Sequence, residues 1–115
     1  MAGANKSDPR LLQVDMARAL NTVQQVLDFG AKKYKDLPKW NEDSIPVEQL
    51  HSAALRHGNL TSRRGLDVVD AESGLRHIAH QIANLLMILQ RSLDKEAENS
   101  PTVDLDVILE RTGWA

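Results

Sequence analysis

The segment from Asp70 to Leu89 constrains the fold most, because its apolar residues repeat at the spacing of a helix. Steps of three and four residues place them on one face: Leu75, Ile78, Ala79, Ile82, Leu85, Leu86 and Leu89. Asp70 is a typical N-cap residue, and Glu72 would lie in the first turn, where a carboxylate favours the helix dipole. The pattern predicts a helix from Asp70 onward that packs one face against a core.

A second set of side chains runs beside this apolar face. His77, His80 and Asn84 are spaced three and four residues apart, so a helix would bring them to one side. A histidine on a half-buried helix face is usually a core residue held by a hydrogen bond. Two histidines and Asn84 on one edge, with Glu72 near the same end, also fit a polar site. Both interpretations stay open at this point.

The other segments also favour helices. Pro9 suits the first turn of a helix that reaches about Tyr34. Pro46 suits the start of another helix of about fifteen residues, with a break at Gly58-Asn59. Residues 61–70 can be either loop or a continuation of that helix, and Thr102 can cap a short last helix. No stretch alternates long enough to require a strand. We therefore predict an all-α fold, a compact bundle of three main helices plus a short C-terminal helix.

Length and composition agree with this fold. A chain of 115 residues is one domain, and with 42% hydrophobic but only 3% aromatic residues its core must be aliphatic. We predict a flexible leader over 1–8, a helical domain over 9–95 and a tail with the short helix over 96–115. Because so small a chain buries a limited share of its surface, we also predict a homo-oligomer.

Charge and cysteine content exclude several classes of protein. The net charge of −2 gives no overall field that would attract a long nucleic acid. With no cysteine, there is no disulfide framework, thiol catalysis or cysteine-bound zinc. No apolar run has the length of a membrane span, and the N-terminus lacks the apolar core of a signal peptide. We expect a cytoplasmic protein without a membrane partner.

No common phosphate-binding or metalloprotease motif occurs, so the chemistry has to come from scattered polar residues. Carboxylates and imidazoles suit a divalent metal ion, and basic side chains suit phosphates. Lys32 and Lys33 would lie at the end of the first helix, where they either complement its dipole or bind phosphates. Trp40, in a loop, either anchors that loop on the core or stacks on a base.

Several pieces occur in the same order in a phage-rich protein family. They are LDFGAKKY (27–34), a loop tryptophan, AALRH (53–57) and DAESGLRHIAH (70–80) followed by Asn84. In these pieces, over roughly residues 15–92, the chain resembles the N-terminal domain of the dATP/dGTP diphosphohydrolases. That domain is similar in character to the MazG-like all-α nucleotide pyrophosphohydrolases. The resemblance implies that residues 9–95 bind a purine dNTP with Mg²⁺ (or Mn²⁺). Water would attack between the α- and β-phosphates, giving dNMP and pyrophosphate.

The resemblance also implies roles for individual residues. The catalytic residues would be Glu72, His77 and His80. The metal ligands would be Asp70, Glu72 and His80. The substrate-binding residues would be Lys32, Lys33, Trp40, Arg56, His57 and Asn84, with Trp40 against the base or sugar.

Two departures keep other functions open. The ExxE and ExxD carboxylate pairs of MazG proteins cannot be recognised in this sequence. In addition, GNLTSRRG follows His57, where the family continues with apolar residues. A phage-encoded pyrophosphohydrolase is the first hypothesis, acting in the host cytoplasm. The second is a phage protein that holds a nucleotide without cleaving it. The third is a structural interaction protein whose histidines are core residues.

Overall fold

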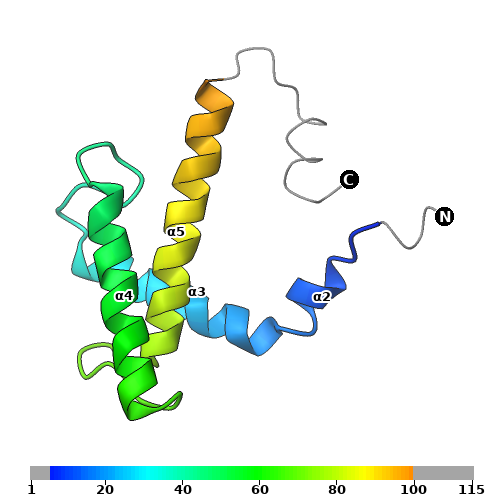
Figure 1. The fold of residues 1–115 in the computed structure, drawn as a ribbon, viewed down its shortest axis with the longest axis vertical. Coiled ribbons are helices and arrows are strands. Elements are labelled where there is room, and N and C mark those ends of the chain that lie inside the picture. The colour runs from blue at the N-terminus through cyan, green and yellow to red at the C-terminus, as the bar shows by residue number, and fades with distance from the viewer. Residues whose placement is uncertain (1–5, 100–115) are drawn as a thin grey trace.

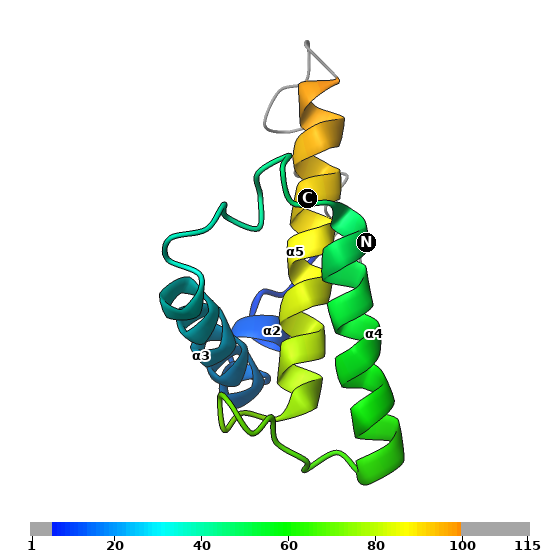
Figure 2. The ribbon, with the colours of Figure 1, turned by 90° about the vertical axis from the view of Figure 1, so that its left-hand side faces the viewer.

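The computed structural model describes residues 6–99, and it confirms the all-α fold over this part of the chain. The elements in chain order are α2 (Arg10–Gln13), α3 (Ala17–Lys33), α4 (Val47–Arg64) and α5 (His77–Glu98). Helices α4 and α5 run side by side in opposite directions, and α3 crosses α5 (Figures 1 and 2). The predicted C-terminal helix lies outside the described residues, and the division into leader, domain and tail stays a prediction. Within residues 6–99, no helix is long and apolar enough to cross a membrane.

A thin aliphatic core holds α3 against α5. It consists of Val23 and Val26 from α3 and Ala79 and Ala83 from α5, with Leu27 and Leu75 packed at its edge. The alanines have little volume, so the two helix backbones can approach closely. Helix α4 contributes Leu50 and Ala54 to the buried side chains. The core is aliphatic, as the composition predicts.

The central helix begins at His77, seven residues later than the sequence predicts. Asp70 does not cap this helix: its Oδ1 accepts hydrogen bonds from the backbone N–H groups of Glu72 and Ser73, both at 3.0 Å, and so closes a turn. Gly74 continues the turn with a φ of +73°, in the left-handed region that favours glycine. Val69 and Arg76 then pair in an isolated antiparallel bridge. The turn places residues 70–76 beside the start of α5 instead of inside it.

The first two predicted helices also differ from the structure. Gly58 does not break α4, because the position lies where α4 meets α5: a Cβ there would be 2.5 Å from Nε2 of Gln81. Helix α4 continues to Arg64 and ends at Gly65, which has a φ of +105°. The first predicted helix is divided into α2 and α3. Helix α2 buries no side chain, so packing does not favour one continuous helix there.

Arg91 fastens the loop between α3 and α4 to α5. Its Nη1 donates hydrogen bonds to the carbonyl oxygens of Trp40 at 3.1 Å and Ile45 at 2.5 Å.

Replacing Arg91 by methionine keeps most of the aliphatic stem but removes both bonds. We expect the free energy of unfolding to fall by about 1.5–3 kcal/mol, the range for hydrogen bonds to charged groups. Urea denaturation measures this loss. Arg91→Lys, which can keep one bond, should lose less, and a methionine variant as stable as the wild type would contradict the prediction.

Candidate functional site

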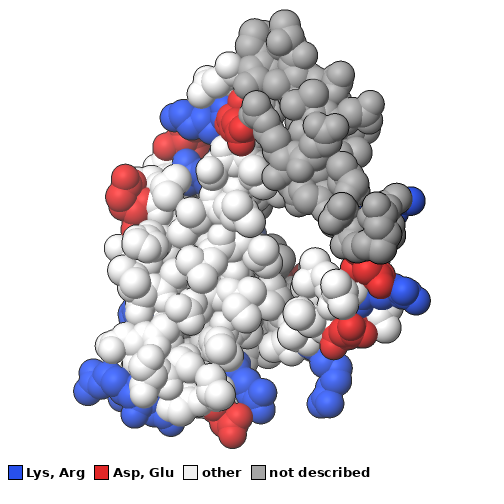
Figure 3. Space-filling view, turned by 45° about the vertical axis from the view of Figure 1, so that its right-hand side comes forward, with Lys and Arg blue, Asp and Glu red and all other residues white. Residues whose placement is uncertain are grey.

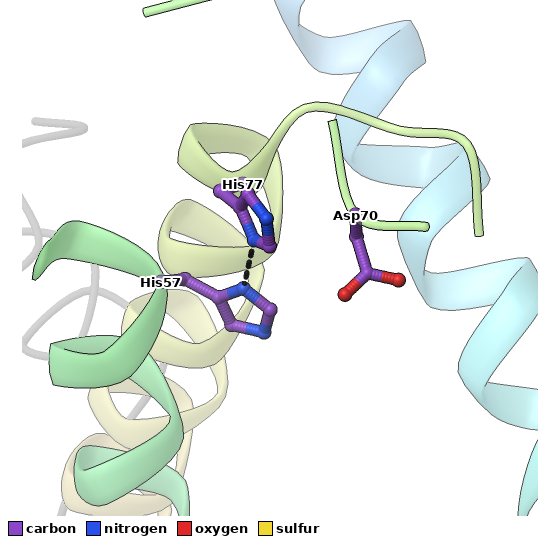
Figure 4. A group of neighbouring side chains, drawn as sticks. All are labelled: His57, Asp70 and His77. Atoms are coloured by element: carbon purple, nitrogen blue, oxygen red, sulfur yellow. Dashed lines mark hydrogen bonds between the residues drawn. The ribbon is translucent and has the colours of Figure 1, made fainter. Parts of the chain in front are cut away.

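Three buried histidines meet where α4 packs against the start of α5. His57 comes from α4, His77 and His80 come from α5, and all three are at most 8% exposed. The Nδ1 atoms of His57 and His77 are 2.8 Å apart. A dashed line marks this contact in Figure 4. The rings of His57 and His80 stack, with centroids 4.6 Å apart and planes 17° from parallel. Two helices that run in opposite directions therefore build one imidazole cluster.

The turn before α5 adds two oxygen-bearing side chains to the cluster. Ser73 Oγ lies 2.7 Å from Nε2 of His80. A carboxylate oxygen of Asp70 lies within 4.8 Å of a ring nitrogen of His57 and of a ring nitrogen of His77. Figure 4 shows Asp70 beside these two rings. Because Asp70 Oδ1 accepts both backbone hydrogen bonds of the turn, Oδ2 is the oxygen available to a ligand.

Burial keeps two of the imidazoles neutral. It lowers the pKa of His57 from 6.5 to about 4, and the neighbouring His80 and Arg56 add to this effect. Burial also lowers the pKa of His80, partly opposed by Asp70. For Asp70, burial raises the pKa, but the two backbone hydrogen bonds outweigh it and the net pKa is below the ordinary value. Near neutral pH the rings of His57 and His80 are thus neutral and the carboxylate of Asp70 is ionised.

This donor set fits some divalent ions better than others. Among residues 6–99, the structure brings together three side chains of kinds that bind metal ions: His57, Asp70 and His77. They supply two imidazole nitrogens and one carboxylate oxygen. Imidazole suits zinc and other first-row transition metals, whereas Mg²⁺ takes oxygen ligands in near-ideal octahedral geometry. The residues therefore fit a metal ion, and their chemistry favours one that accepts nitrogen.

Positive side chains flank the cluster. Lys33 Nζ is 2.8 Å from a carboxylate oxygen of Glu72, and the hydrogen bond to Glu72 and then that to Tyr34 raise the pKa of Lys33. Arg56 precedes His57 on α4 and is exposed. Lys33 and Arg56 both help to lower the pKa of His80, so each acts electrostatically on the cluster. Glu72 thus lies beside a lysine at the rim and is not part of the group formed by Asp70 and the histidines.

A shallow pocket of about 330 Å³ adjoins the cluster. Its lining comes from one side of α3 and from the turn: Gln25, Asp28, Phe29, Lys32, Ser73 and Leu75. The Phe29 ring meets the His80 ring edge-on at 6.2 Å, and Ser73 contacts both pocket and cluster. The volume is at the lower end of the range for small-molecule pockets. A ligand in this pocket would therefore lie next to the imidazoles.

The structure brings most of the predicted site residues together. Asn84 Nδ2 donates to the backbone carbonyl of His80, one turn further along α5. Glu72 lies at the rim with Lys33, and Trp40 lies farther away. Its carbonyl binds Arg91, which lies eleven residues after His80, or about 16 Å along the helix. The predicted contact between Trp40 and the base or sugar stays untested, but the backbone places Trp40 well away from the cluster.

Sequence reasoning missed Ser73 as a partner of His80 and missed Phe29, Gln25 and Asp28 as pocket residues. Ser73 does lie within the ESGLRH motif, but a helix beginning at Asp70 would have made it a first-turn residue. The pocket residues share one side of α3 with Lys32, at helical spacing. That pattern was visible in the sequence, but it does not distinguish a pocket wall from a solvated helix face.

Comparison with known proteins identifies the family of this chain. The chain matches no curated protein and no solved structure. One family model matches, described as dATP/dGTP diphosphohydrolase, N-terminal, and it spans residues 1–100. This confirms the resemblance carried by LDFGAKKY and ESGLRHIAH. Because the match includes most of the chain, with its histidines, Asp70 and lysines, this protein belongs to the dATP/dGTP diphosphohydrolase N-terminal domain family.

Proposed function

We propose that this domain hydrolyses purine dNTPs to dNMP and pyrophosphate with the help of a divalent metal ion. The observation that carries the proposal is the position of the imidazole cluster. Ser73 and Phe29 connect it to the pocket on α3, and Lys33 and Arg56 both act electrostatically on His80. A nucleoside in the pocket would direct its phosphates towards these charges and the cluster. Membership of the diphosphohydrolase family supports a nucleotide as the substrate.

The chain's own residues supply binding and proton transfer. Lys32, Lys33 and Arg56 bind phosphate oxygens by charge-assisted hydrogen bonds. His80 is neutral at working pH and accepts the proton of the attacking water, while Ser73 holds its ring through Nε2. The water oxygen bonds to the α-phosphorus, and the bond to the oxygen bridging the α- and β-phosphates breaks. A divalent ion, when bound, would supply Lewis-acid polarisation and lower the pKa of a bound water.

Incubation with each of the four dNTPs tests the proposal. Mn²⁺, Mg²⁺ and Co²⁺ are supplied one at a time, and with at least one of them dATP and dGTP should be converted to dNMP and pyrophosphate, resolved by anion-exchange chromatography. In ¹⁸O-labelled water the label should enter dNMP, because attack is at the α-phosphorus. A chelator should stop the reaction. Purine dNTPs that stay intact with every metal would contradict the proposed activity.

A nucleotide-binding protein without catalysis is the second candidate. The observation that favours it is the single carboxylate in the cluster, that of Asp70. Such a protein would be stabilised by its nucleotide, by about 2.7 kcal/mol at a hundredfold excess over Kd, and would release it unchanged. Either activity suits a phage-encoded protein that controls a nucleotide pool in the host cytoplasm. A purely structural protein would show no nucleotide effect on its melting temperature.

We also propose that the domain forms a homo-oligomer. Helix α5 exposes four large apolar side chains, 38–54% accessible: Ile82, Leu85, Leu86 and Leu89. One face of the molecule carries a broad area without charged side chains (Figure 3).

The double variant Leu85→Glu, Leu89→Glu should shift the mass measured by light scattering to that of the monomer, because charges would be buried in the contact. Gln49→Glu, at an exposed position of α4, is the control. A wild-type monomer would exclude the oligomer.

A further inference from the structure

We propose that His57, His77 and Asp70 bind one borderline transition-metal ion, of the type of Zn²⁺ or Co²⁺, in preference to Mg²⁺. The inference rests on the proposed function for its catalytic meaning, since it names the metal of that site. It also differs from the sequence prediction, which placed the metal on Asp70, Glu72 and His80. The contacts within and around the imidazole cluster support this metal assignment.

The ligand atoms already converge. The Nδ1 atoms of His57 and His77 face each other at 2.8 Å, a distance that leaves room for one proton between them, so at least one of them presents a lone pair. One ring nitrogen of His57, one of His77 and a carboxylate oxygen of Asp70 lie within 4.8 Å of one another. Around a tetrahedral zinc ion, with bonds near 2.0–2.2 Å, donor atoms are roughly 3–3.5 Å apart. Adjustments of about 1 Å would therefore place the three donors around one ion.

Each of the three ligands is held in place by its own part of the structure. His57 lies in the middle of α4 and stacks on His80, while His77 is the first residue of α5. The turn fixes Asp70 through Oδ1, which leaves Oδ2 to face a cation. Partners of this kind orient metal ligands in known sites. Three protein ligands would leave the fourth position for water or a phosphate oxygen, as in catalytic zinc sites.

The assignment differs from the predicted one because of where Glu72 and His80 lie. The Glu72 carboxylate is paired with Lys33 Nζ at 2.8 Å, on the exposed rim. His80 does not belong to the three residues whose ligand atoms converge, and its Nε2 lies 2.7 Å from Ser73 Oγ. With one carboxylate and two imidazoles, the remaining group lacks the oxygen ligands that Mg²⁺ requires.

Titration of the chelator-treated protein with one metal salt at a time, without nucleotide, tests the site. Isothermal calorimetry should show one tight equivalent of Zn²⁺ or Co²⁺ and no binding of Mg²⁺ at the same concentrations. Bound Co²⁺ should give the intense visible absorption of a four-coordinate ion. Equal or tighter binding of Mg²⁺ would overturn the assignment.

Variants separate this site from non-specific binding to histidine. Asp70→Asn keeps an oxygen that can close the turn but removes the charge, so the protein should fold as judged by circular dichroism. Zn²⁺ affinity should fall by more than the roughly 10–100-fold that loss of an outer partner costs. His57→Gln should lose as much. His51→Gln changes an exposed histidine on the same helix and should keep full affinity.

The results also distinguish failure of the inference from failure of the proposed function. Zn²⁺ affinity that survives both Asp70→Asn and His57→Gln, or that depends on His51 or Glu72 instead, overturns the ligand set. Tight Zn²⁺ binding in a protein that leaves every dNTP intact supports the metal site and removes only the enzymatic proposal. Hydrolysis with Mg²⁺ by a protein that binds no Zn²⁺ removes only the metal inference.

Discussion

Replacing His80 by alanine is expected to lower the rate of pyrophosphate release from dATP or dGTP by about 100-fold or more, the usual contribution of a general base. The ring contacts Ser73, Phe29 and His57 at once, so its removal takes away a proton acceptor and a connection between pocket and cluster. The effect should fall mainly on kcat, because the phosphate-binding lysines stay. Steady-state kinetics with pyrophosphate detection measures it.

Two controls make this result interpretable. His51→Ala removes an exposed histidine from α4 and should leave the rate unchanged. Ser73→Ala should lower the rate of pyrophosphate release less than His80→Ala does, because it removes the partner of the imidazole ring and leaves the ring itself in place. Glu72→Ala is also expected to lower the rate, through the loss of the partner that holds Lys33. Unchanged rates in both His80→Ala and Glu72→Ala would remove the site assignment.

Acidification from pH 6.5 to about 4 is expected to lower the free energy of unfolding of the chelator-treated protein by at most about 3 kcal/mol. In the unfolded chain His57 takes up a proton below its ordinary pKa of 6.5, whereas in the fold burial lowers this pKa to about 4. The unfolded state thus binds more protons between these two values, and the free energy of unfolding falls as pH falls through this range. Below about 4 the folded ring is protonated too, and its contribution stops growing. The lowered pKa of His80 acts in the same direction.

Urea denaturation at a series of pH values measures this slope. His57→Gln should show a shallower decline than the wild type between pH 6.5 and 4, because the buried ring that resists protonation is gone. Saturating Zn²⁺ should also change the profile, since protons and metal compete for the same ring nitrogens. A wild type and a His57→Gln variant with the same slope would contradict the assignment of the effect to this ring.

The sequence by itself determined the helical class, the aliphatic core and the family. These follow from local information: apolar residues at three- and four-residue steps in α5, prolines at two helix starts, and two short motifs that stay in order. It also predicted Asp70, His77 and His80 as site residues, and the structure places these residues close together. Helical periodicity and motifs are properties of neighbouring residues, so no tertiary contact is needed to find them.

Only the tertiary structure decided how these residues combine. Sequence spacing could not show that His57 meets His77, twenty positions away, because that contact depends on how α4 packs against α5 at Gly58. Nor could it show that Asp70 closes a turn, since the same residue type favours a helix start and a turn equally well. The cluster exists because packing of two helices and one turn brings three buried rings and a carboxylate together. Local propensities do not determine such packing.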